Sequence, residues 1–351
     1  MNVLVTGGLG FIGSAVVRRL LRDPNARVVT LDAETYAASP EALEGALTDP
    51  RHTRVKGDIR DGRLVRELLA AHRPNAIMHL AAESHVDRSI DGPADFISTN
   101  VVGTLTLLEA VREYLPAAPQ GFVFHHISTD EVFGHLHPGD PPFTETSPYA
   151  PRSPYAASKA ASDHLVRAWH ATYGLPAFVT NTCNNYGPWQ FPEKLIPLTI
   201  ANAIEGKPLP VYGRGENIRD WIYVDDHAAG LVAALHRSKP GETWCLGAAS
   251  ERRNIEVVEQ VCAILDRLLP DPGGPRRRLI SFVGDRPGHD FRYAIDPGRA
   301  MAALGWVPAE TFATGLEKTV RWYLDNRAWW EGIRAARYGG ERLGQETGAA
   351  A

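Results

Sequence analysis

Short apolar runs rich in β-branched residues alternate with helical stretches through the first half of the chain. The predicted strands are Val3–Val5, Arg27–Leu31, Thr53–Lys56, Ala76–Leu80 and Phe122–Ile127. The predicted helices are Ser14–Leu21, Glu41–Leu47, Arg63–Ala71 and Phe96–Tyr114. This alternation favours right-handed βαβ units, and therefore an α/β fold with a Rossmann-type, doubly wound parallel sheet.

The pattern changes after about Thr180, where proline and glycine become frequent and the strict alternation weakens. We predict a Rossmann domain over residues 1–180 and a smaller, mixed C-terminal domain over residues 181–343. Val224–Leu235 and Thr243–Leu246, in the region near 220–250, are expected to return to the main sheet. Residues 344–351 are rich in Gly, Ala and polar groups, and are predicted to form a loose tail.

Charge and composition exclude several classes of protein. The 37 basic and 41 acidic residues are spread along the chain and leave a formal charge of −4, which gives no electrostatic footprint for nucleic acid or an anionic membrane. The start does not resemble a signal peptide, and no apolar run approaches the roughly 18 residues that span a bilayer. Cys183, Cys245 and Cys262 have no paired spacing, and the adjacent His125 and His126 point to opposite faces of one strand. We therefore expect a soluble cytoplasmic protein without a disulfide framework or a metal site.

A glycine-rich turn follows the first strand directly and opens the first helix. Gly7, Gly10 and Gly13 have the spacing that permits a tight turn, close approach of a pyrophosphate and close packing of helix on strand. Asp32 ends the next strand 19 residues after Gly13, near the spacing of a carboxylate that binds ribose hydroxyls, and no arginine stands beside it. The sequence thus predicts a site for NAD rather than NADP. A glycine turn that binds no ligand is the alternative.

Other residues complete the predicted cofactor site. Some belong to the glycine turn. The others follow the third and fourth strands, where an adenine and a pyrophosphate would lie. For these short segments, a structural turn without a ligand is the alternative. The residues of both groups are Phe11, Ile12, Asp58, Ile59, Leu80, Ala81 and Ala82.

Tyr155 and Lys159 are four residues apart in a helix that opens at Ser153, so they share one face. An ammonium held near a phenol favours the phenolate and lowers the tyrosine pKa, and the phenolate could then take the proton of a sugar hydroxyl. A solvated helix face is the alternative.

Thr129, Asp130 and Glu131 stand at the carboxyl end of the fifth predicted strand, where parallel sheets carry their active sites. One hydroxyl would suffice for oxidation and reduction at a single carbon. Two carboxylates indicate extra proton transfers, one as base and one as acid, if their environments separate their pKa values. The alternative is a pair of carboxylates that merely caps a helix or a turn.

Eight segments carry a resemblance to a known family. They are Thr6–Gly13, His79–Ser89, Ser128–Gly134, Ser153–Lys159, Asn184–Pro188, Phe191–Pro197, Arg219–Trp221 and Asp285–Asp290. On these segments the chain, from Met1 to about Leu343, resembles the dTDP-glucose 4,6-dehydratase family of the extended short-chain dehydrogenase/reductase superfamily.

The resemblance implies a lyase that uses tightly bound NAD and loses one water from a nucleotide sugar. Tyr155, supported by Lys159, would take the proton from the sugar O4, with Thr129 hydrogen-bonded to that oxygen. Glu131 would remove the C5 proton, and Asp130 would protonate the departing C6 hydroxyl. Residues 1–180 would then hold NAD and residues 181–343 would mainly hold the substrate.

The resemblance also assigns residues to the two ligands and implies an assembly. Asn100 and Asn185 would lie near the cofactor, and Tyr155 and Lys159 would bind it as well. The substrate would be held by Ser84, Thr129, Asn184, Lys194, Leu195, Pro210, Tyr212, Arg219, Asn254, Arg286 and His289. The helix near Phe96–Tyr114 and the Tyr155 helix would pair across a two-fold axis, which predicts a homodimer.

The chain departs from the family pattern at several positions, at residues 38–39, 133, 182–183, 245 and 248. Ala38-Ser39 replaces Gly-Asn, which puts contacts on the adenosine side in doubt, and Cys245 and Ala248 could alter base or sugar preference. UDP-hexose 4-epimerases, UDP-glucuronate decarboxylases, GDP-mannose dehydratases and a non-catalytic dinucleotide-sensing protein are the alternatives. The Thr-Asp-Glu triplet favours a glucose-type 4,6-dehydratase over the other enzymes, and together with the Tyr155–Lys159 pair it disfavours the non-catalytic protein. Thymidine or uridine as the base stays open.

Overall fold

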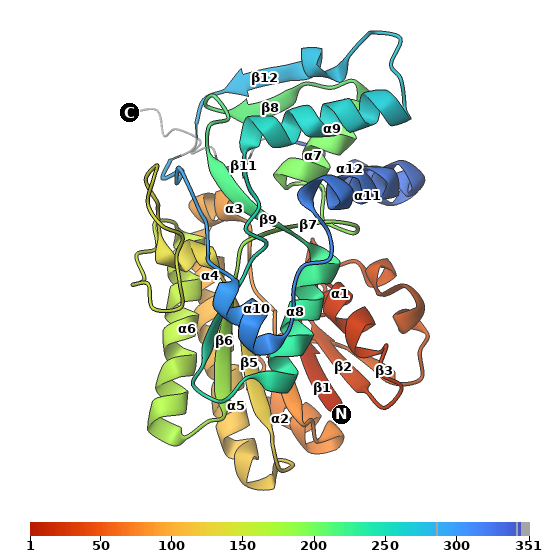
Figure 1. The fold of residues 1–351 in the computed structure, drawn as a ribbon. Coiled ribbons are helices and arrows are strands. Elements are labelled where there is room, and N and C mark those ends of the chain that lie inside the picture. Colours follow the sequence, from red (N-terminus) through yellow and green to blue (C-terminus); the bar gives the residue numbers. More distant parts are fainter. Residues whose placement is uncertain (286, 342, 345–351) are drawn as a thin grey trace, which may run out of the picture.

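A seven-stranded parallel sheet forms the centre of the larger part of the protein (Figure 1). The computed structural model describes residues 1–285, 287–341 and 343–344. Within these residues the sheet order is β10-β6-β5-β4-β1-β2-β3, which confirms the doubly wound, Rossmann-type fold. Its strands are β1 (Asn2–Thr6), β2 (Arg27–Asp32), β3 (His52–Lys56), β4 (Ala76–His79), β5 (Val123–Thr129), β6 (Ala177–Thr182) and β10 (Thr243–Leu246).

Helices cover both faces of this sheet, so most of its strands bury side chains on both sides, whereas the edge strand β3 is more exposed. One face packs against α1 (Phe11–Leu20), α8 (Val224–Arg237) and α10 (Gly298–Leu304). The opposite face packs against α2 (Gly62–His72), α5 (Thr104–Tyr114) and α6 (Pro154–Tyr173).

A second, smaller layer lies beyond the carboxyl ends of the main strands, at the top of Figure 1. It contains a three-stranded sheet in the order β11-β9-β7, a parallel pair β12-β8, and several helices. The strands are β7 (Asn184–Tyr186), β8 (Leu209–Tyr212), β9 (Ile218–Tyr223), β11 (Glu251–Arg253) and β12 (Ile280–Val283). The helices are α7 (Leu195–Glu205), α9 (Asn254–Leu268), α11 (Phe312–Asp325) and α12 (Arg327–Ala336).

Short helical segments complete the chain. They are η1 (Pro40–Leu47), α3 (Val86–Asp91), α4 (Pro93–Phe96), η2 (Ile97–Gly103), η3 (Leu115–Ala117), η4 (Asp130–Phe133) and η5 (Arg276–Leu279). The segment predicted as a helix over 41–47 is the 3₁₀ helix η1, with a break at Glu44. The long helix predicted over 96–114 is divided, since η2 is a π-helix that leads into α5. The carbonyl of Asn100 in η2 accepts hydrogen bonds from the hydroxyls of Thr104 (2.6 Å) and Ser162 (2.8 Å), and these donors compete with the regular backbone ladder.

The return of the chain to the main sheet occurs where the sequence predicts it. Thr243 of β10 pairs with Val179 of β6, and α8 packs against α1. The division into domains at residue 180 stays a prediction, and residues 345–351 of the predicted tail lie outside the described residues.

The last helix contacts the loop that follows β2. The indole Nε1 of Trp329 in α12 donates to Oγ of Ser39 at 2.9 Å, and the guanidinium of Arg337 donates to the carbonyl of Ala38 at 3.1 Å. Ser39 is one of the positions at which the chain departs from the family pattern. Its side chain connects the loop after β2 to α12, which lies 290 positions later in the sequence.

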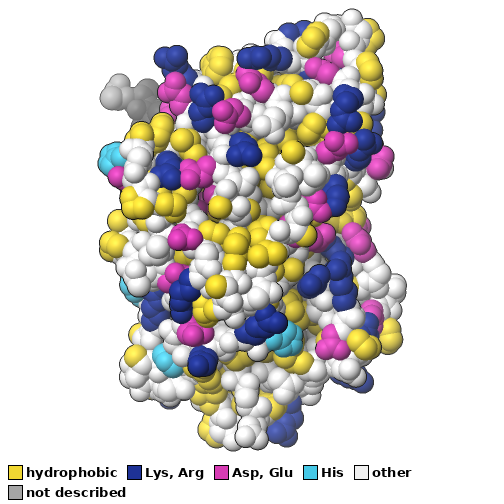
Figure 2. Space-filling view, in the orientation of Figure 1, with side chains coloured by type: hydrophobic (Ala, Val, Ile, Leu, Met, Phe, Trp, Pro, Cys, Tyr) yellow, Lys and Arg dark blue, Asp and Glu magenta, His cyan; other side chains and the backbone are white. Residues whose placement is uncertain are grey.

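The visible surface carries mixed charge. Figure 2 shows Lys and Arg side chains interspersed with Asp and Glu over this face. Among the described residues, no helix combines the length and apolar character that crossing a bilayer requires.

Candidate active site

A cavity of about 440 Å³ opens at the carboxyl ends of the central strands and reaches the smaller layer. Most predicted site residues contribute to its walls, so the fold brings together segments that are far apart in the sequence. The predicted residues that line it are Gly7, Gly10, Phe11, Ile12, Gly13, Asp32, Asp58, Ile59, Leu80, Ala81, Ala82, Ser84, Thr129, Asp130, Glu131, Tyr155, Lys159, Asn184, Asn185, Lys194 and Leu195.

The glycine turn forms one end of the cavity. Gly7 has a φ of +72°, and a Cβ there would lie 2.7 Å from the backbone nitrogen of Ala81. A Cβ on Gly13 would lie 2.0 Å from the carbonyl oxygen of Gly7. Within the described chain no side chain caps α1 at Gly10, so the N–H groups of its first turn are available to a ligand. A helix start of this kind suits the pyrophosphate of a dinucleotide.

Replacing Gly13 by Ala is expected to destabilise this turn by about 1–3 kcal/mol, because the added methyl group overlaps backbone that cannot move aside. The variant should also lose most of its NAD, measured as cofactor content of the purified protein beside its Tm. In the part of the chain that the structure describes, a methyl group added at Gly45 would have no atom within 4 Å, so Gly45→Ala serves as the control that keeps both properties. An unchanged NAD content in the Gly13 variant would contradict this account of the turn.

The two carboxylates expected near the ribose and adenine differ in their surroundings. Asp32 accepts hydrogen bonds from the backbone N–H of Leu9 (2.9 Å) and of Glu34 (2.8 Å), and burial raises its pKa. Asp58 pairs with Arg60 at 2.6 Å, and this hydrogen bond lowers its pKa. A carboxylate at Asp32 favours a ribose with free hydroxyls over the extra phosphate of NADP, and the guanidinium of Arg60 is already paired with Asp58.

Tyr155 and Lys159 come from the first turns of α6. Ser153 caps this helix by accepting from the N–H of Ala156, and Pro154 occupies its first position. The ammonium of Lys159 donates to the carbonyl of Ile127 in β5 at 2.8 Å, and burial lowers the pKa of Lys159 to about 8. Lys159 therefore loses its proton more readily than an exposed lysine does.

The phenol of Tyr155 differs from the sequence-based expectation. Burial and the negative charge of Glu131 raise its pKa, while a hydrogen bond with Thr129 lowers it only in part. The expected fall in the pKa of Tyr155 is therefore wrong for the protein alone. The positive charge of an oxidised nicotinamide beside the ring would act in the opposite direction.

Thr129, Asp130 and Glu131 occupy the junction of β5 and η4. The hydroxyl of Thr129 donates to Oδ1 of Asp130 (3.3 Å) and accepts from the N–H of Glu131 (3.3 Å). Burial, together with the negative charges of Glu131 and Asp220, holds the pKa of Asp130 well above its ordinary value. Asp130 therefore holds its proton more firmly than an exposed carboxyl group does, which suits the role of an acid.

Several predicted substrate residues lie outside the cavity wall, on the smaller layer or beside it. They are Pro210, Tyr212, Arg219, Asn254 and His289. The guanidinium of Arg219 is buried, donates to the carbonyl of Asp290 at 2.9 Å and lies 4.3 Å from the ring centroid of Tyr293. Tyr212 donates to Asp87 at 3.0 Å. Arg286 lies outside the described residues.

Asn100 also lies outside the wall, although it was predicted to be near the cofactor. Its amide donates to the carbonyl of Glu83 (2.9 Å) and to the hydroxyl of Ser158 (2.8 Å), and it accepts from the N–H of Glu83 (2.9 Å). Asn100 thus ties the loop after β4 to the catalytic helix, one turn away from Tyr155.

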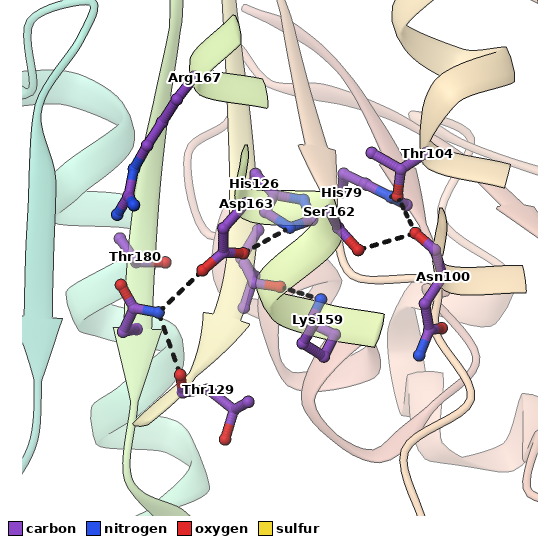
Figure 3. A network of polar contacts seen from close by, with 12 residues as sticks. His79, Asn100, Thr104, His126, Thr129, Lys159, Ser162, Asp163, Arg167 and Thr180 are labelled. Carbon is purple, nitrogen blue, oxygen red and sulfur yellow. Dashed lines mark hydrogen bonds and ion pairs between the residues drawn. The ribbon is translucent and has the colours of Figure 1, made fainter. Parts of the chain in front are cut away.

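Sequence reasoning gave no role to several residues of the site. Arg60, Glu83, Gln190, Glu193 and Trp221 line the cavity. Behind its wall, Asp163 and Asn181 connect α6 to β5 and β6 (Figure 3). The available signal for Asp163 was its place four residues after Lys159, on the same helix face.

The structure places residues that depart from the family pattern, and the adjacent histidines of β5, either at the cavity or in the core. Ala38 and Cys183 line the cavity, whereas Cys245 is buried in the main core. His125 stacks on Phe178 with ring centroids 4.2 Å apart, and His126 lies against Asp163. In the described part of the chain, no group of three or more His, Cys, Asp or Glu side chains could hold a metal ion.

The fold and the site together define an extended short-chain dehydrogenase/reductase of the nucleotide-sugar epimerase/dehydratase class. The sequence profile described as GDP-mannose 4,6 dehydratase matches residues 4–319. A dTDP-glucose 4,6-dehydratase from Escherichia coli is 55% identical over 359 residues, which covers 98% of this chain and 99% of that protein. The chain belongs to the dTDP-glucose 4,6-dehydratase family.

Solved structures of the same family agree with this assignment. The dTDP-glucose 4,6-dehydratase from Streptomyces venezuelae, solved with NAD and a second ligand bound, is 46% identical with a TM-score of 0.87, covering 95% of this chain and 100% of that one. The enzyme from Bacillus anthracis, solved in complex with NAD, is 41% identical with a TM-score of 0.85, covering 95% of this chain and 99% of that one.

Proposed function

We propose that this protein converts dTDP-glucose to dTDP-4-keto-6-deoxyglucose and water, with NAD as a cofactor that is returned to its starting form. The observation that carries the proposal is the placement of Thr129, Asp130 and Glu131 in one cavity with Tyr155 and Lys159. A 4-epimerase needs only the oxidation at C4, so it has no use for two carboxylates at this position.

The residues divide the chemistry among themselves. NAD, when bound, supplies the group that accepts a hydride from C4 and later delivers it to C6. Tyr155 takes the proton of the O4 hydroxyl, Thr129 orients that hydroxyl, and Lys159 stabilises the phenolate. The carbonyl at C4 acidifies the neighbouring C5 hydrogen, which Glu131 removes as a proton. Asp130 gives its proton to the C6 hydroxyl, which leaves as water. C5 is reprotonated once C6 has received the hydride, which gives the 4-keto-6-deoxy sugar.

In this proposal the two predicted domains bind different ligands. Residues 1–180 hold the cofactor, and residues 181–343 mainly hold the nucleotide sugar. Ser84, Asn184, Lys194 and Leu195 contact the sugar and diphosphate from the cavity wall. Pro210, Tyr212, Arg219, Asn254, Arg286 and His289 are assigned to the nucleotide end by family resemblance.

Incubation of the purified protein with dTDP-glucose tests the function. The expected product has lost one water and carries a 4-keto chromophore in alkali, without net formation of NADH. Interconversion of glucose and galactose forms at unchanged mass would instead make the protein an epimerase. No reaction with dTDP-glucose, in the presence of added NAD, would overturn the proposal, and parallel UDP-glucose and GDP-mannose assays would show whether another nucleotide sugar is the substrate.

We also propose a homodimer, formed through η2, α5 and α6. The two α-helices pack side by side on one flank of the molecule (Figure 1). Large apolar side chains are exposed there, at Ile97 (47%), Val102 (47%), Leu105 (36%) and Tyr173 (50%). Apolar side chains gathered on an outer helical surface favour contact with a second copy.

The three cysteines are buried and form no disulfide, which supports a location in the reducing cytoplasm.

Replacing Val102 by Glu is expected to weaken this dimer by about 2 kcal/mol or more, because a charge would be buried without a partner. Light scattering during size-exclusion chromatography should then give the monomer mass at micromolar protein. Val307 is 66% exposed on a different surface, so Val307→Glu is the matched control that stays dimeric. A monomeric wild type would contradict the proposed assembly.

A further inference from the structure

A buried carboxylate stands one helical turn beyond the catalytic lysine. Asp163 lies on α6 four residues after Lys159, and its side chain has no exposed surface. Figure 3 shows it directed at β5 and β6, and it is not among the residues that line the cavity. It is therefore outside the reach of substrate and cofactor.

Three neighbours fix this carboxylate in place. Oδ1 lies 3.1 Å from Nε2 of His126. Oδ2 accepts from the hydroxyl of Tyr149 at 2.7 Å and from the amide of Asn181 at 3.2 Å. The same amide donates to the carbonyl of Thr129 at 3.0 Å, so the network reaches the residue that is proposed to orient the sugar hydroxyl.

Asp163 is the acidic side chain whose negative charge favours the cationic form of Lys159, one helical turn away. His79 on β4 and His126 on β5 face the same interior, and burial and nearby charges lower the pKa of both histidines, so both are neutral near pH 7. Tyr155 shares the helix face, and Arg167, one turn beyond Asp163, donates to the hydroxyl of Tyr149 at 2.8 Å. Burial lowers the pKa of Lys159, while the negative charge of Asp163 opposes that fall.

We propose that Asp163 is a positioning residue that keeps Lys159 in its cationic form and, through Asn181, fixes the end of β5 at Thr129. The inference rests on the proposed function, since it concerns how Lys159 supports the phenolate. Asp163 takes no part in proton transfer with the substrate.

The first test compares pH profiles of kcat/KM for the wild type, Asp163→Asn, Asp163→Glu and Tyr149→Phe. Activity is lost as pH rises through the pKa of Lys159, which is about 8. Without the negative charge that pKa falls, so the alkaline limb of Asp163→Asn should move to lower pH by about one unit, a loss of about tenfold in kcat/KM above the new midpoint. Asp163→Glu keeps the charge. Tyr149→Phe removes the hydrogen bonds of the Tyr149 hydroxyl with Asp163 and Arg167 but no charge, so both variants should keep the wild-type limb.

A uniformly slower Asp163→Asn enzyme with an unmoved alkaline limb would overturn the proposal, because a purely structural role predicts that result. A limb that moves equally in Tyr149→Phe would overturn it as well. The shift is interpretable only if the wild type is active, so a failure of the proposed function shows up separately, as a wild type with no turnover at any pH.

The second test needs no turnover. Thermal unfolding of Lys159→Met, Asp163→Asn and the double variant measures whether the two side chains depend on each other. Each single variant leaves one buried charge without its partner, whereas the double variant leaves none. We expect the double variant to have a higher Tm than Asp163→Asn. If Asp163→Asn does not fold, a folded double variant supports the proposal, and an unfolded one overturns it.

Discussion

Replacing Asp130 by Asn is expected to stop the loss of water while leaving the earlier steps intact. The asparagine side chain has the same shape and can still accept from Thr129, but it has no acidic proton to give to the C6 hydroxyl. Loss of a general acid costs about 10²–10⁴-fold in kcat. Burial and the negative charges of Glu131 and Asp220 raise the pKa of Asp130, which suits the role of acid proposed for it.

Two isotopic measurements separate this step from the one before it. In D₂O, Asp130→Asn should still exchange the C5 hydrogen of the substrate, seen as a gain of one deuterium in recovered dTDP-glucose. Glu131→Gln should stop both the exchange and the formation of product. If Asp130→Asn lost the exchange while Glu131→Gln kept it, the two roles would have to be reversed.

Tyr155→Phe should remove activity at the first step, with an expected loss of about 10²–10⁴-fold in kcat. The phenyl ring occupies the same space next to Phe96, whose ring lies edge-on at 6.2 Å between centroids, so the fold should be kept. No carbonyl forms at C4 without a base at O4, and the C5 hydrogen then stays non-acidic. Neither water loss nor deuterium exchange should occur, which distinguishes this variant from Asp130→Asn.

Thermal unfolding and NAD content provide the control for Tyr155→Phe, and both should match the wild type. A Tyr155→Phe enzyme that still exchanges the C5 hydrogen would show that another group deprotonates O4.

The main sheet and the cofactor turn were predictable because their signals are local. Residues such as Val3–Val5 are apolar on both faces, and the glycines at 7, 10 and 13 stand directly between a strand and a helix. Thr129, Asp130 and Glu131 follow a strand end, and parallel strands collect such ends at one edge. These features depend on a few consecutive residues, so they can be predicted from the sequence without the tertiary structure.

The features that could not be predicted from the sequence depend on packing between distant segments. The π-helix η2 follows from hydroxyls of Thr104 and Ser162 that converge on one carbonyl, and the second of these comes from another helix. The high pKa of Tyr155 follows from its burial and from Glu131, which lies on a different element. In the sequence Asp163 cannot be distinguished from a solvent-exposed charged residue on a helix. Its burial is caused by packing in the folded protein.

The contact between α12 and the loop after β2 sets the order in which the protein can be completed during synthesis. Ser39 and Trp329 are 290 positions apart, and Ala38 belongs to the cavity wall. The first strands can fold as they leave the ribosome, but this wall gains its last support only when almost the whole chain has emerged. A chain truncated before Trp329 would therefore lack this support of the cavity wall, and a ligand that binds in the cavity should stabilise it less than it stabilises a chain that includes α12.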